Sequence, residues 1–344
     1  MKLDPPPPFL VRLAARIASW VLPVAHGAPP DPRRLRRVLV VRTDDRVGNA
    51  LLTIPLARAL ANALPEARVD LLLASKRAIA AEGLPGISVI RFDKRARPIA
   101  YMAFLRELRR ARYDAVIDAA HWHAFSLTSF LLSLWAASPR WLLGAQRGPS
   151  RLYSAAVPLP EREDKTALLQ GLGLHPATPR LETALGQGAP LVQGRFAALN
   201  PGARKADHRW PAERYAEVAR ELKKRLRCVV FWGPGEEALA RQVAQLSGAE
   251  VAPPTDLDQL AACLRAAALV ITNDTGPMHL AVACGAPVVA LFLDADGLRW
   301  AHPGPRFAAV VAPANAAPVL DASWRLLDSG QAPGEPARSL EETT

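Results

Sequence analysis

The stretch LVITNDTGPMHLAVACGAPVVALF, residues 269–292, decides the fold. Its first apolar run, Leu269–Thr272, predicts a buried strand, and Pro277–Cys284 predicts a helix because proline is favoured at the first helical position. Gly285 ends that helix, since glycine is favoured just past a helix C-terminus, and Val288–Phe292 predicts the next strand. Strand, helix and strand in this order indicate a parallel unit of an α/β fold.

The polar loop Asn273-Asp274-Thr275-Gly276 between that strand and that helix predicts an anion site. Backbone N–H groups at a helix start, together with the positive end of the helix dipole, suit a diphosphate. Gly276 lets a phosphate approach the backbone, the Thr275 hydroxyl can donate to it, and His279 lies one turn inside the helix, within reach of a sugar or phosphate oxygen. The alternative is that Asp274 or Thr275 only caps the helix.

The same alternation of strand and helix patterns recurs along the chain. The further predicted strands are Val38–Val41, Val69–Leu73, Ile87–Phe92, Tyr113–Ala119, Phe196–Leu199 and Cys228–Trp232. The 344 residues fit two domains of roughly 150 residues each, and the Pro-, Gly- and charge-rich residues 158–195 predict the passage between them. We expect an N-terminal segment over residues 1–35, α/β domains over 36–180 and 195–312, and a tail over 313–344 that is partly helical or disordered.

Composition limits the class of protein. Half of the residues are hydrophobic and 22% are charged, which is typical of a globular chain. The net charge of +11 favours an anionic partner, which is nucleic acid, a phosphorylated small molecule or an anionic membrane. Nucleic acid is disfavoured because we find no aromatic–basic RNA motif, zinc finger or helix-turn-helix. Cys228, Cys263 and Cys284 lie far apart, which predicts buried, reduced thiols and no disulfide or zinc site.

Residues 9–24, FLVRLAARIASWVLPV, form an apolar segment interrupted by two arginines. The segment is too short to span a bilayer and lacks the cleavage signal of a secretory leader. Its apolar residues fall at helical spacing, with the arginines elsewhere on the helical wheel; they are Phe9, Leu13, Ile17, Trp20 and Val21. The segment therefore predicts either a helix that lies on a membrane surface or a helix packed on the protein's own core.

Two further loops follow predicted strands in the second half. One is the turn Asn200-Pro201-Gly202-Ala203, and the other runs from Gly233 to Glu236, where Glu236 could hold a ribose hydroxyl. Ligands of open α/β sheets bind at the carboxyl ends of strands, so these loops and Asn273–Gly276 predict one binding site. Three cationic residues follow the first turn, or alternatively form a solvated run of charge: Lys205, His208 and Arg209.

Five segments together resemble a known family. They are VLVVRTD at 38–44, VGNALLTIP at 47–55, NPGA at 200–203, HRWPAERY at 208–215 and NDTGPMHLA at 273–281. With them the chain resembles glycosyltransferase family 9, the ADP-heptose:lipopolysaccharide heptosyltransferases, over about residues 36–330. The resemblance implies a GT-B fold of two Rossmann-like domains that face each other across a cleft, the first for the acceptor and the second for the nucleotide sugar. It also implies inverting, metal-independent transfer of heptose from an ADP-sugar to the lipopolysaccharide inner core, with no cofactor beyond the donor.

The resemblance assigns donor-site roles to residues of two loops. It implies diphosphate and sugar contacts for Asp274, Thr275, Gly276 and His279. It implies a phosphate turn for Asn200, Gly202 and Ala203. The family commonly has a lysine where this chain has His208, and a neutral imidazole is a weaker phosphate partner than an ammonium, although Lys205 or Arg209 would compensate.

The N-terminal loop departs from the family pattern at the general base. The family usually has Gly-Asp before its apolar helix, whereas this chain has Gly48-Asn49, and an amide cannot take a proton from an acceptor hydroxyl. Asp44 and Asp45 precede that pair in the same loop, and we expect Asp45 to be the base, with Asp44 as the second candidate. The alternative is that both are solvent-exposed loop acids and that Asn49 caps the helix.

Acceptor contacts are expected from the first domain. Gly48 lies in the candidate catalytic loop, His121 and His123 follow the predicted strand Tyr113–Ala119, and Arg147 would meet the acidic acceptor that the resemblance implies. Two histidines two residues apart also suggest a metal, but we expect no metal site because no third ligand lies nearby. The basic surface and the helix of residues 9–24 suit an anionic lipid-linked acceptor, which predicts a cytoplasmic protein peripheral to the inner membrane.

Two other functions remain open from the sequence. One keeps the enzyme class and changes the sugar donor or the glycan acceptor, because phosphate loops contact what all nucleotide-sugar donors share. The other is a non-catalytic nucleotide-sugar-binding protein, which Asn49 and His208 favour.

Overall fold

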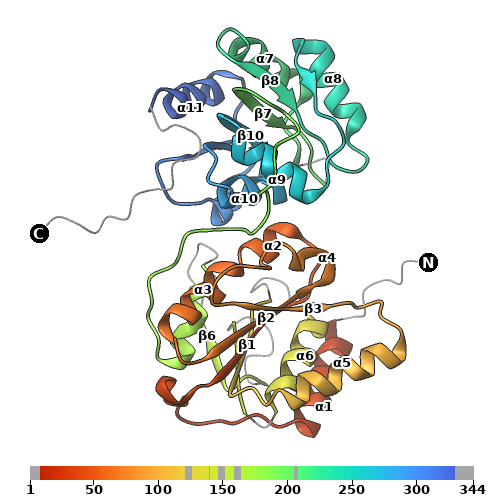
Figure 1. The fold of residues 1–344 in the computed structure, drawn as a ribbon, viewed down its shortest axis with the longest axis vertical. Coiled ribbons are helices and arrows are strands. Elements are labelled where there is room, and N and C mark those ends of the chain that lie inside the picture. The colour runs from red at the N-terminus through yellow and green to blue at the C-terminus, as the bar shows by residue number, and fades with distance from the viewer. Residues whose placement is uncertain are drawn as a thin grey trace, which may run out of the picture. The chain divides into compact units, whose positions relative to one another are not determined.

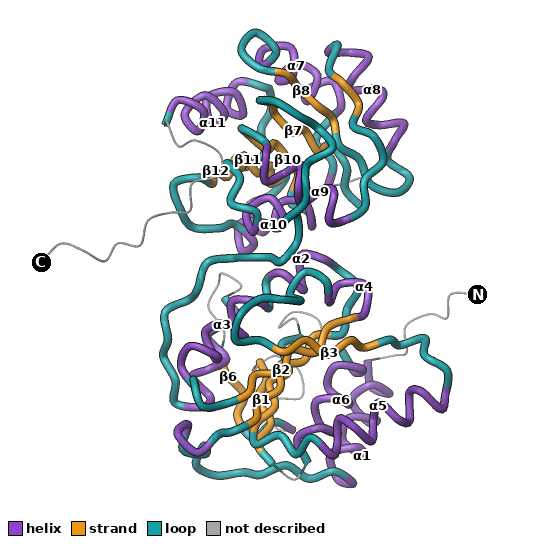
Figure 2. Tube along the Cα trace, in the orientation of Figure 1, coloured by secondary structure: helices purple, strands orange, loops and turns teal. Residues whose placement is uncertain are grey.

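The protein is described by a computed structural model that covers residues 8–120, 126–138, 140–145, 152–158, 164–204 and 208–329. It divides into two compact units, Met1–Ala184 and Leu185–Thr344, which we call unit 1 and unit 2 (Figure 1). Each unit is built around its own parallel sheet, with helices on both faces of the sheet (Figure 2). The predicted α/β class is therefore confirmed for both halves of the chain.

The sheet of unit 1 has six strands in the order β3-β2-β1-β4-β5-β6, and its strand pairs are parallel. The strands are β1 (Arg37–Arg42), β2 (Arg68–Ala74), β3 (Ser88–Phe92), β4 (Ala115–Asp118), β5 (Trp141–Ala145) and β6 (Ala155–Val157). Val40 of β1 pairs with Leu71 on one side and Ile117 on the other. The chain changes direction across the sheet between β1 and β4, and ligands of such sheets bind where this switch occurs.

Helices cover both faces of this sheet (Figure 1). The helical elements of unit 1 are α1 (Pro8–Val21), η1 (Pro32–Arg34), α2 (Val47–Leu51), α3 (Ile54–Ala63), α4 (Ser75–Ala78), α5 (Pro98–Arg110), α6 (Leu127–Ala137) and η3 (Lys165–Leu172). Helices α1 and α5 both pack on α6, over the sheet face that carries Leu39 and Val41, while α3 and η3 pack together on the other face. Successive residues of a buried strand point to opposite faces, so the middle of β1, Val38–Val41, is apolar on both faces.

Unit 2 repeats the same strand order. Its sheet runs β12-β11-β10-β7-β8-β9, with parallel strand pairs. The strands are β7 (Phe196–Asn200), β8 (Arg227–Val230), β9 (Glu250–Val251), β10 (Leu269–Asn273), β11 (Val288–Phe292) and β12 (Phe307–Val311). The switch in direction now lies between β7 and β10, which pair directly.

The helical elements of unit 2 are α7 (Ala212–Leu222), α8 (Glu237–Ser247), α9 (Leu257–Ala266), α10 (Gly276–Ala283), η5 (Ala295–Trp300) and α11 (Ala317–Asp328). Tyr215, Val218 and Leu222 are fully buried, so α7 turns one apolar stripe to the core as its sequence period predicts. Helix α11 packs on α7, β11 and β12, which makes the first part of the expected tail a layer of unit 2.

Several elements were not predicted from the sequence. Helix α6 is apolar on nearly all sides and shows little helical period, and β5, β6, β9 and β12 are short. Within the Pro- and Gly-rich residues 158–195, η3 is ordered and buries Leu168, Leu169 and Leu172 in unit 1. The composition of residues 158–195 predicted a linker because proline, glycine and charged residues outnumber these three leucines.

The three cysteines are free and buried, as predicted, and burial raises the pKa of the Cys228 and Cys284 thiols to about 12. Among the described residues, every helix is too short or too polar to cross a membrane.

Candidate active site

The loops that the sequence singled out in unit 2 follow three neighbouring strands, β10, β7 and β8. Asn273, fully buried at the end of β10, joins them. Its side-chain amide donates to the carbonyl oxygens of Pro201 at 2.9 Å and Gly202 at 3.3 Å, and its oxygen accepts from the Trp210 amide at 3.3 Å. One side chain therefore fixes the β7 turn against the β10 loop at the switch point.

Asn200, the last residue of β7, supports the same junction. Its amide donates to the Thr272 hydroxyl at 3.2 Å, and its backbone carbonyl accepts from the buried Tyr215 hydroxyl at 3.3 Å. The indole of Trp210 donates to the Pro313 carbonyl at 2.8 Å and lies edge-on to the Tyr215 ring. Asn200 therefore fixes the start of the β7 turn, and its side chain points toward Thr272 of the neighbouring strand β10.

Glu236 packs directly on the glycine turn. A Cβ at Gly202 would overlap the Glu236 carboxylate, so the carboxylate can take this position only because residue 202 has no side chain. The carboxylate accepts from the Gly233 amide at 3.1 Å and lies 3.7 Å from the Arg209 guanidinium, which also donates to the Ala203 carbonyl at 2.8 Å. Glu236 and Arg209 therefore brace the ends of β7 and β8, and His208 beside them is exposed.

The start of α10 lies at the end of β10. Thr275 is the residue before the helix, and its hydroxyl donates to the Asn273 carbonyl at 3.2 Å, with no capping bond to the helix amides. The alternative in which Thr275 only caps the helix is therefore wrong. Gly276 and Pro277 begin the helix, so the positive end of its dipole lies at the loop. Pro277 has no N–H, and the Met278 amide donates to the Thr275 carbonyl at 3.0 Å.

Asp274 stands between this helix start and the loop after β11. Burial raises the pKa of its carboxyl to about 7, and the nearby Asp294 adds to the rise while Arg299 opposes it. Gly297 lies close by, because a Cβ there would come within 3.4 Å of an Asp274 oxygen. Asp274 consequently exchanges a proton near neutral pH, which an exposed aspartate does not.

We expect this carboxyl to make stability depend on pH. Its folded pKa lies above its unfolded value, so it stabilises the fold below about pH 4, and that contribution is lost as the pH rises toward 7. Urea unfolding between pH 4 and pH 8 should show that Asp274→Asn removes this fall from the wild-type curve. Asp296→Asn, which changes a carboxylate that is 90% exposed, is the matched control and should leave the curve unchanged. Equal slopes for wild type and Asp274→Asn would refute the assignment.

His279 lies one turn into α10, where it is 6% exposed. Its Nδ1 is 2.8 Å from Nε2 of His302, and the Trp300 ring lies edge-on to it. Burial lowers the pKa of His302 to about 4, so His302 stays neutral at physiological pH. Because a neutral imidazole offers one donor and one acceptor, the contact couples the tautomer of His279 to that of His302. No motif marked His302 in the sequence, because it lies 23 residues from His279.

The candidate base region of unit 1 lies at its own switch point. Arg42, 1% exposed at the end of β1, donates to the Ala119 carbonyl after β4 at 2.6 Å and forms an ion pair with Asp44 at 2.5 Å. The Asp44 carboxylate also accepts from the Asn49 side-chain amide at 2.7 Å and from the Arg46 amide at 3.1 Å. Asp44 is therefore held between β1 and β4, with its side chain 37% exposed.

Asp45 is directed elsewhere. Its carboxylate forms an ion pair with Lys94 at 2.6 Å, and its carbonyl accepts from Arg77 on α4 at 2.6 Å. Lys94 follows β3, the outermost strand, and its hydrogen bond holds the pKa of the Asp45 carboxyl below the ordinary value. Asp45 is therefore bound at the edge of the sheet, whereas Asp44 lies at the switch point, so the geometry favours Asp44 over Asp45 as the general base.

A buried carboxyl near Arg42 was missed by sequence reasoning. Asp118 ends β4, is 2% exposed, and accepts from the Ser129 hydroxyl at 2.7 Å and the Tyr153 hydroxyl at 2.9 Å. Burial raises the pKa of both Asp118 and Tyr153. Gly144 makes the contact possible, because a Cβ there would overlap the Tyr153 ring. Through these two hydrogen bonds Asp118 links the end of β4 to Ser129 of α6 and to Tyr153, which precedes β6.

The arrangement matches a known family. A sequence model of glycosyltransferase family 9 (heptosyltransferase) matches residues 101–326, well over half of the chain. The chain belongs to glycosyltransferase family 9.

Individual relatives agree with this family 9 assignment. The lipopolysaccharide core heptosyltransferase OpsX of Haemophilus influenzae is 24% identical over 240 residues, which are 63% of this chain and 68% of that protein. The lipopolysaccharide heptosyltransferase 1 of Escherichia coli K12 is 26% identical over 286 residues, which are 76% of this chain and 88% of that protein.

Solved structures share the fold of this family 9 glycosyltransferase. A glycosyl transferase family 9 structure from Veillonella parvula has a TM-score of 0.72 at 20% identity and covers 88% of this chain and 99% of its own. The E. coli heptosyltransferase WaaC with ADP has a TM-score of 0.68 at 24% identity, covering 83% and 98%. The predicted GT-B fold is confirmed by these likenesses.

Several predicted site residues of the glycosyltransferase lie outside the described residues: His121, His123, Arg147 and Lys205. Gly48 and Asn49 are buried in α2, directly after the loop that holds Asp44. Within the ranges that the structure covers, we find no group of three or more His, Cys, Asp or Glu side chains that could hold a metal ion.

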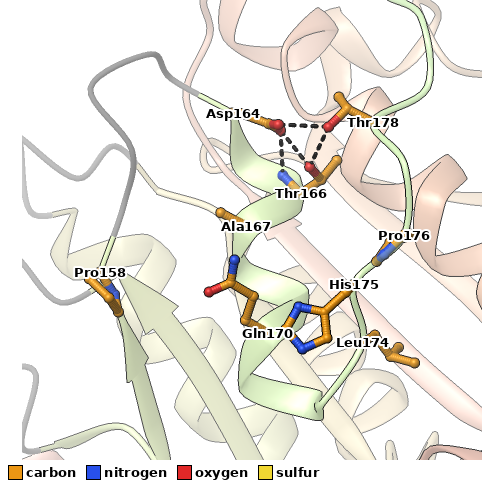
Figure 3. Close-up of a pocket in the computed structure, with 9 residues that line it drawn as sticks. All are labelled: Pro158, Asp164, Thr166, Ala167, Gln170, Leu174, His175, Pro176 and Thr178. Carbon is orange, nitrogen blue, oxygen red and sulfur yellow. Dashed lines mark hydrogen bonds between the residues drawn. The ribbon is translucent and has the colours of Figure 1, made fainter.

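A hollow of about 490 Å³ lies elsewhere in unit 1 (Figure 3). Asp164 at its rim accepts from the Thr166 amide at 2.9 Å and from the Thr166 and Thr178 hydroxyls, both at 2.6 Å. The carboxylate is thus used to cap η3 and to hold Thr178. The hollow is lined by Pro158, Asp164, Thr166, Ala167, Gln170, Leu174, His175, Pro176 and Thr178, and these residues are distinct from the candidate active site.

Proposed function

We propose that this glycosyltransferase moves a heptose, or a closely related sugar, from an ADP-sugar to an acceptor of the lipopolysaccharide core type. The observation that carries the proposal is the junction made by Asn273, which brings the β7 turn and the α10 start together at the switch point of unit 2. The names of the relatives support the choice of sugar and acceptor, since both are lipopolysaccharide heptosyltransferases.

In this proposal the donor diphosphate binds at the start of α10. The Gly276 amide and the positive end of the helix dipole stabilise the charge that develops on the departing diphosphate. The Gly202 turn lets the backbone approach the same group, and His279 donates a hydrogen bond to a sugar or phosphate oxygen. Because these groups supply the leaving-group stabilisation, the transfer is proposed to be metal-independent.

Asp44 is the proposed general base. It would remove the proton from the acceptor hydroxyl as the oxygen attacks the anomeric carbon from the side opposite the diphosphate, which inverts the configuration. Asn49 then acts through Asp44, because its amide donates to the carboxylate and fixes its orientation. A second carboxylate at position 49 would lie in contact with Asp44 and raise one of the two pKa values, so an amide there is compatible with a charged base.

The acceptor is proposed to be lipid-linked and anionic, which places the enzyme at the cytoplasmic face of a membrane as a peripheral protein. The net charge of +11 supports an anionic partner. The first domain would bind this acceptor and the second would bind the donor.

The deciding experiment is a coupled assay of ADP release with ADP-heptose as donor and a Kdo-lipid A acceptor. We expect ADP release that depends on both substrates and gives a product heavier by one heptose in mass spectrometry. ADP release that depends on a different donor or glycan would keep the enzyme class and replace the substrate. Tight ADP-heptose binding without ADP release on any acceptor would instead favour the non-catalytic alternative, which the replacement of the family's acid by Asn49 motivates.

A further inference from the structure

Helix α1 has two apolar faces, one packed on unit 1 and one exposed. Ala15, Ala18 and Leu22 pack into the hydrophobic cluster of unit 1 against α6, so the helix is anchored to the fold. The side chains of Leu13, Ile17, Trp20 and Val21 form a second apolar stripe that points away from that cluster; we call it the α1 stripe. Their exposed fractions are 50% for Leu13, 56% for Ile17, 87% for Trp20 and 63% for Val21. The core-packing alternative for this segment is therefore confirmed for the inner face of the helix, and the outer face keeps the apolar residues on which the membrane alternative depends.

An exposed stripe of this kind is costly in water. Soluble proteins seldom expose several large apolar side chains in a row, and such a stripe marks a surface that is covered in use. Tryptophan in particular prefers the boundary between water and the acyl chains of a bilayer, where its ring is buried and its N–H stays hydrated.

The segment that carries the stripe and the segment that contains α5 are both strongly basic. Residues 8–36 contain five arginines and one aspartate, and Arg16 is exposed on α1 itself. Residues 94–112 contain seven Lys and Arg and one glutamate, and they include α5, which packs on α6 like α1 (Figure 1). Helix α5 also exposes Ile99 and Met102. Cations that border an apolar stripe complement a surface of anionic headgroups over acyl chains.

We propose that the α1 stripe is a membrane-docking surface that inserts Trp20 and Ile17 into the headgroup boundary of an anionic bilayer. With its 14 residues, α1 is too short to span a bilayer, so it lies in the plane of the surface. The inner face of α1 stays on α6 and holds unit 1 to the lipid. The docking surface does not depend on the proposed function. Only its role, which is to bring unit 1 to a lipid-linked acceptor, rests on that function.

The flanking charge argues for lipid over a second copy of this chain. Two α1 stripes in a symmetric dimer would bring two arginine-rich borders together, and like charges at an interface oppose association. An anionic bilayer satisfies both the stripe and its border.

The test is flotation of the purified full chain with vesicles of phosphatidylethanolamine and phosphatidylglycerol, compared with vesicles of phosphatidylcholine alone. We expect wild type to float with the anionic vesicles, and the double variant Ile17→Glu/Trp20→Glu to lose binding by about tenfold or more. Arg16→Glu should weaken binding to the anionic vesicles only. The control is Leu246→Glu, which places one carboxylate at an exposed leucine on α8 of unit 2 and should float like wild type.

Circular dichroism and thermal unfolding are measured for each variant to check that it is folded. Wild-type flotation by the double variant, or no flotation by wild type, would overturn the proposal. So would a wild-type dimer in solution that the double variant converts to monomer, because α1 would then be covered by a second copy. ADP release with a detergent-solubilised acceptor should be the same for wild type and the double variant. Failure of ADP release with intact flotation would therefore reject the proposed function and leave the docking surface standing.

Discussion

Replacing Asp44 by Asn is expected to reduce kcat for sugar transfer by about 100- to 10,000-fold while the affinity for ADP stays within about threefold of wild type. The asparagine can still accept the bonds from Asn49 and the Arg46 amide, so the loop keeps its geometry, but it cannot take a proton. The measurements are steady-state ADP release and calorimetric titration of ADP.

The matched control is Asp45→Asn in the same loop. Asp45 pairs with Lys94 at the β3 edge of the sheet, so its loss is expected to change kcat by less than about fivefold, in line with a surface ion pair. Because Asp44→Asn removes the partner of the buried Arg42, thermal unfolding must be measured alongside. A reversed result, in which Asp45→Asn abolishes transfer and Asp44→Asn does not, would return the role of base to Asp45.

Asn273→Ala is expected to weaken ADP binding at least tenfold and to lower the unfolding free energy by about 2 to 4 kcal/mol. The substitution leaves two carbonyl oxygens and one amide without their partner at a fully buried position. The β7 turn and the start of α10 would then lose their fixed separation, which a diphosphate needs to contact both. Urea unfolding and ADP titration measure the two effects.

Thr272→Val is the control for Asn273→Ala, because it changes the neighbouring buried residue of β10. It removes the partner of the Asn200 amide and the hydroxyl bond to the Asn273 carbonyl at 3.1 Å, but leaves the three bonds of the Asn273 side chain in place. We therefore expect about 1 to 2 kcal/mol of lost stability and nearly normal ADP binding. If Asn273→Ala binds ADP as tightly as wild type does, the hydrogen bonds of Asn273 are not needed for the donor site. That result would contradict the argument on which the proposed function rests.

Much of the fold could be predicted from the sequence because its strands are buried on both faces. Val288–Phe292 was predicted with its observed bounds, and the loops after β7, β8 and β10 were placed at one edge of one sheet. Parallel strands covered by helices are continuous apolar runs, and each is followed by a polar loop, so position in the sequence gives position at the carboxyl edge. The glycines of those loops could be found for the same reason.

The details of the candidate site depend on residues far apart in the chain. Asp44 and Asp45 are indistinguishable in sequence, and only the ion pair between Asp45 and Lys94, 49 residues away, directs Asp45 to the sheet edge. The pKa of Asp274 depends on Asp294, and the tautomer of His279 on His302. Composition could not reveal such contacts, because they follow from burial and from the register of neighbouring strands.

The repeated strand order of the two sheets has a consequence for how this chain can change. Each unit has its own switch point, and the described contacts that shape the donor loops come from residues 200–313, within unit 2. On the proposed division of roles, a mutation that alters the sugar bound by unit 2 is therefore expected to leave the loops of unit 1 structurally intact. Recombination near residue 184, where the two units divide, is then expected to give new pairings of donor and acceptor without redesign of either sheet.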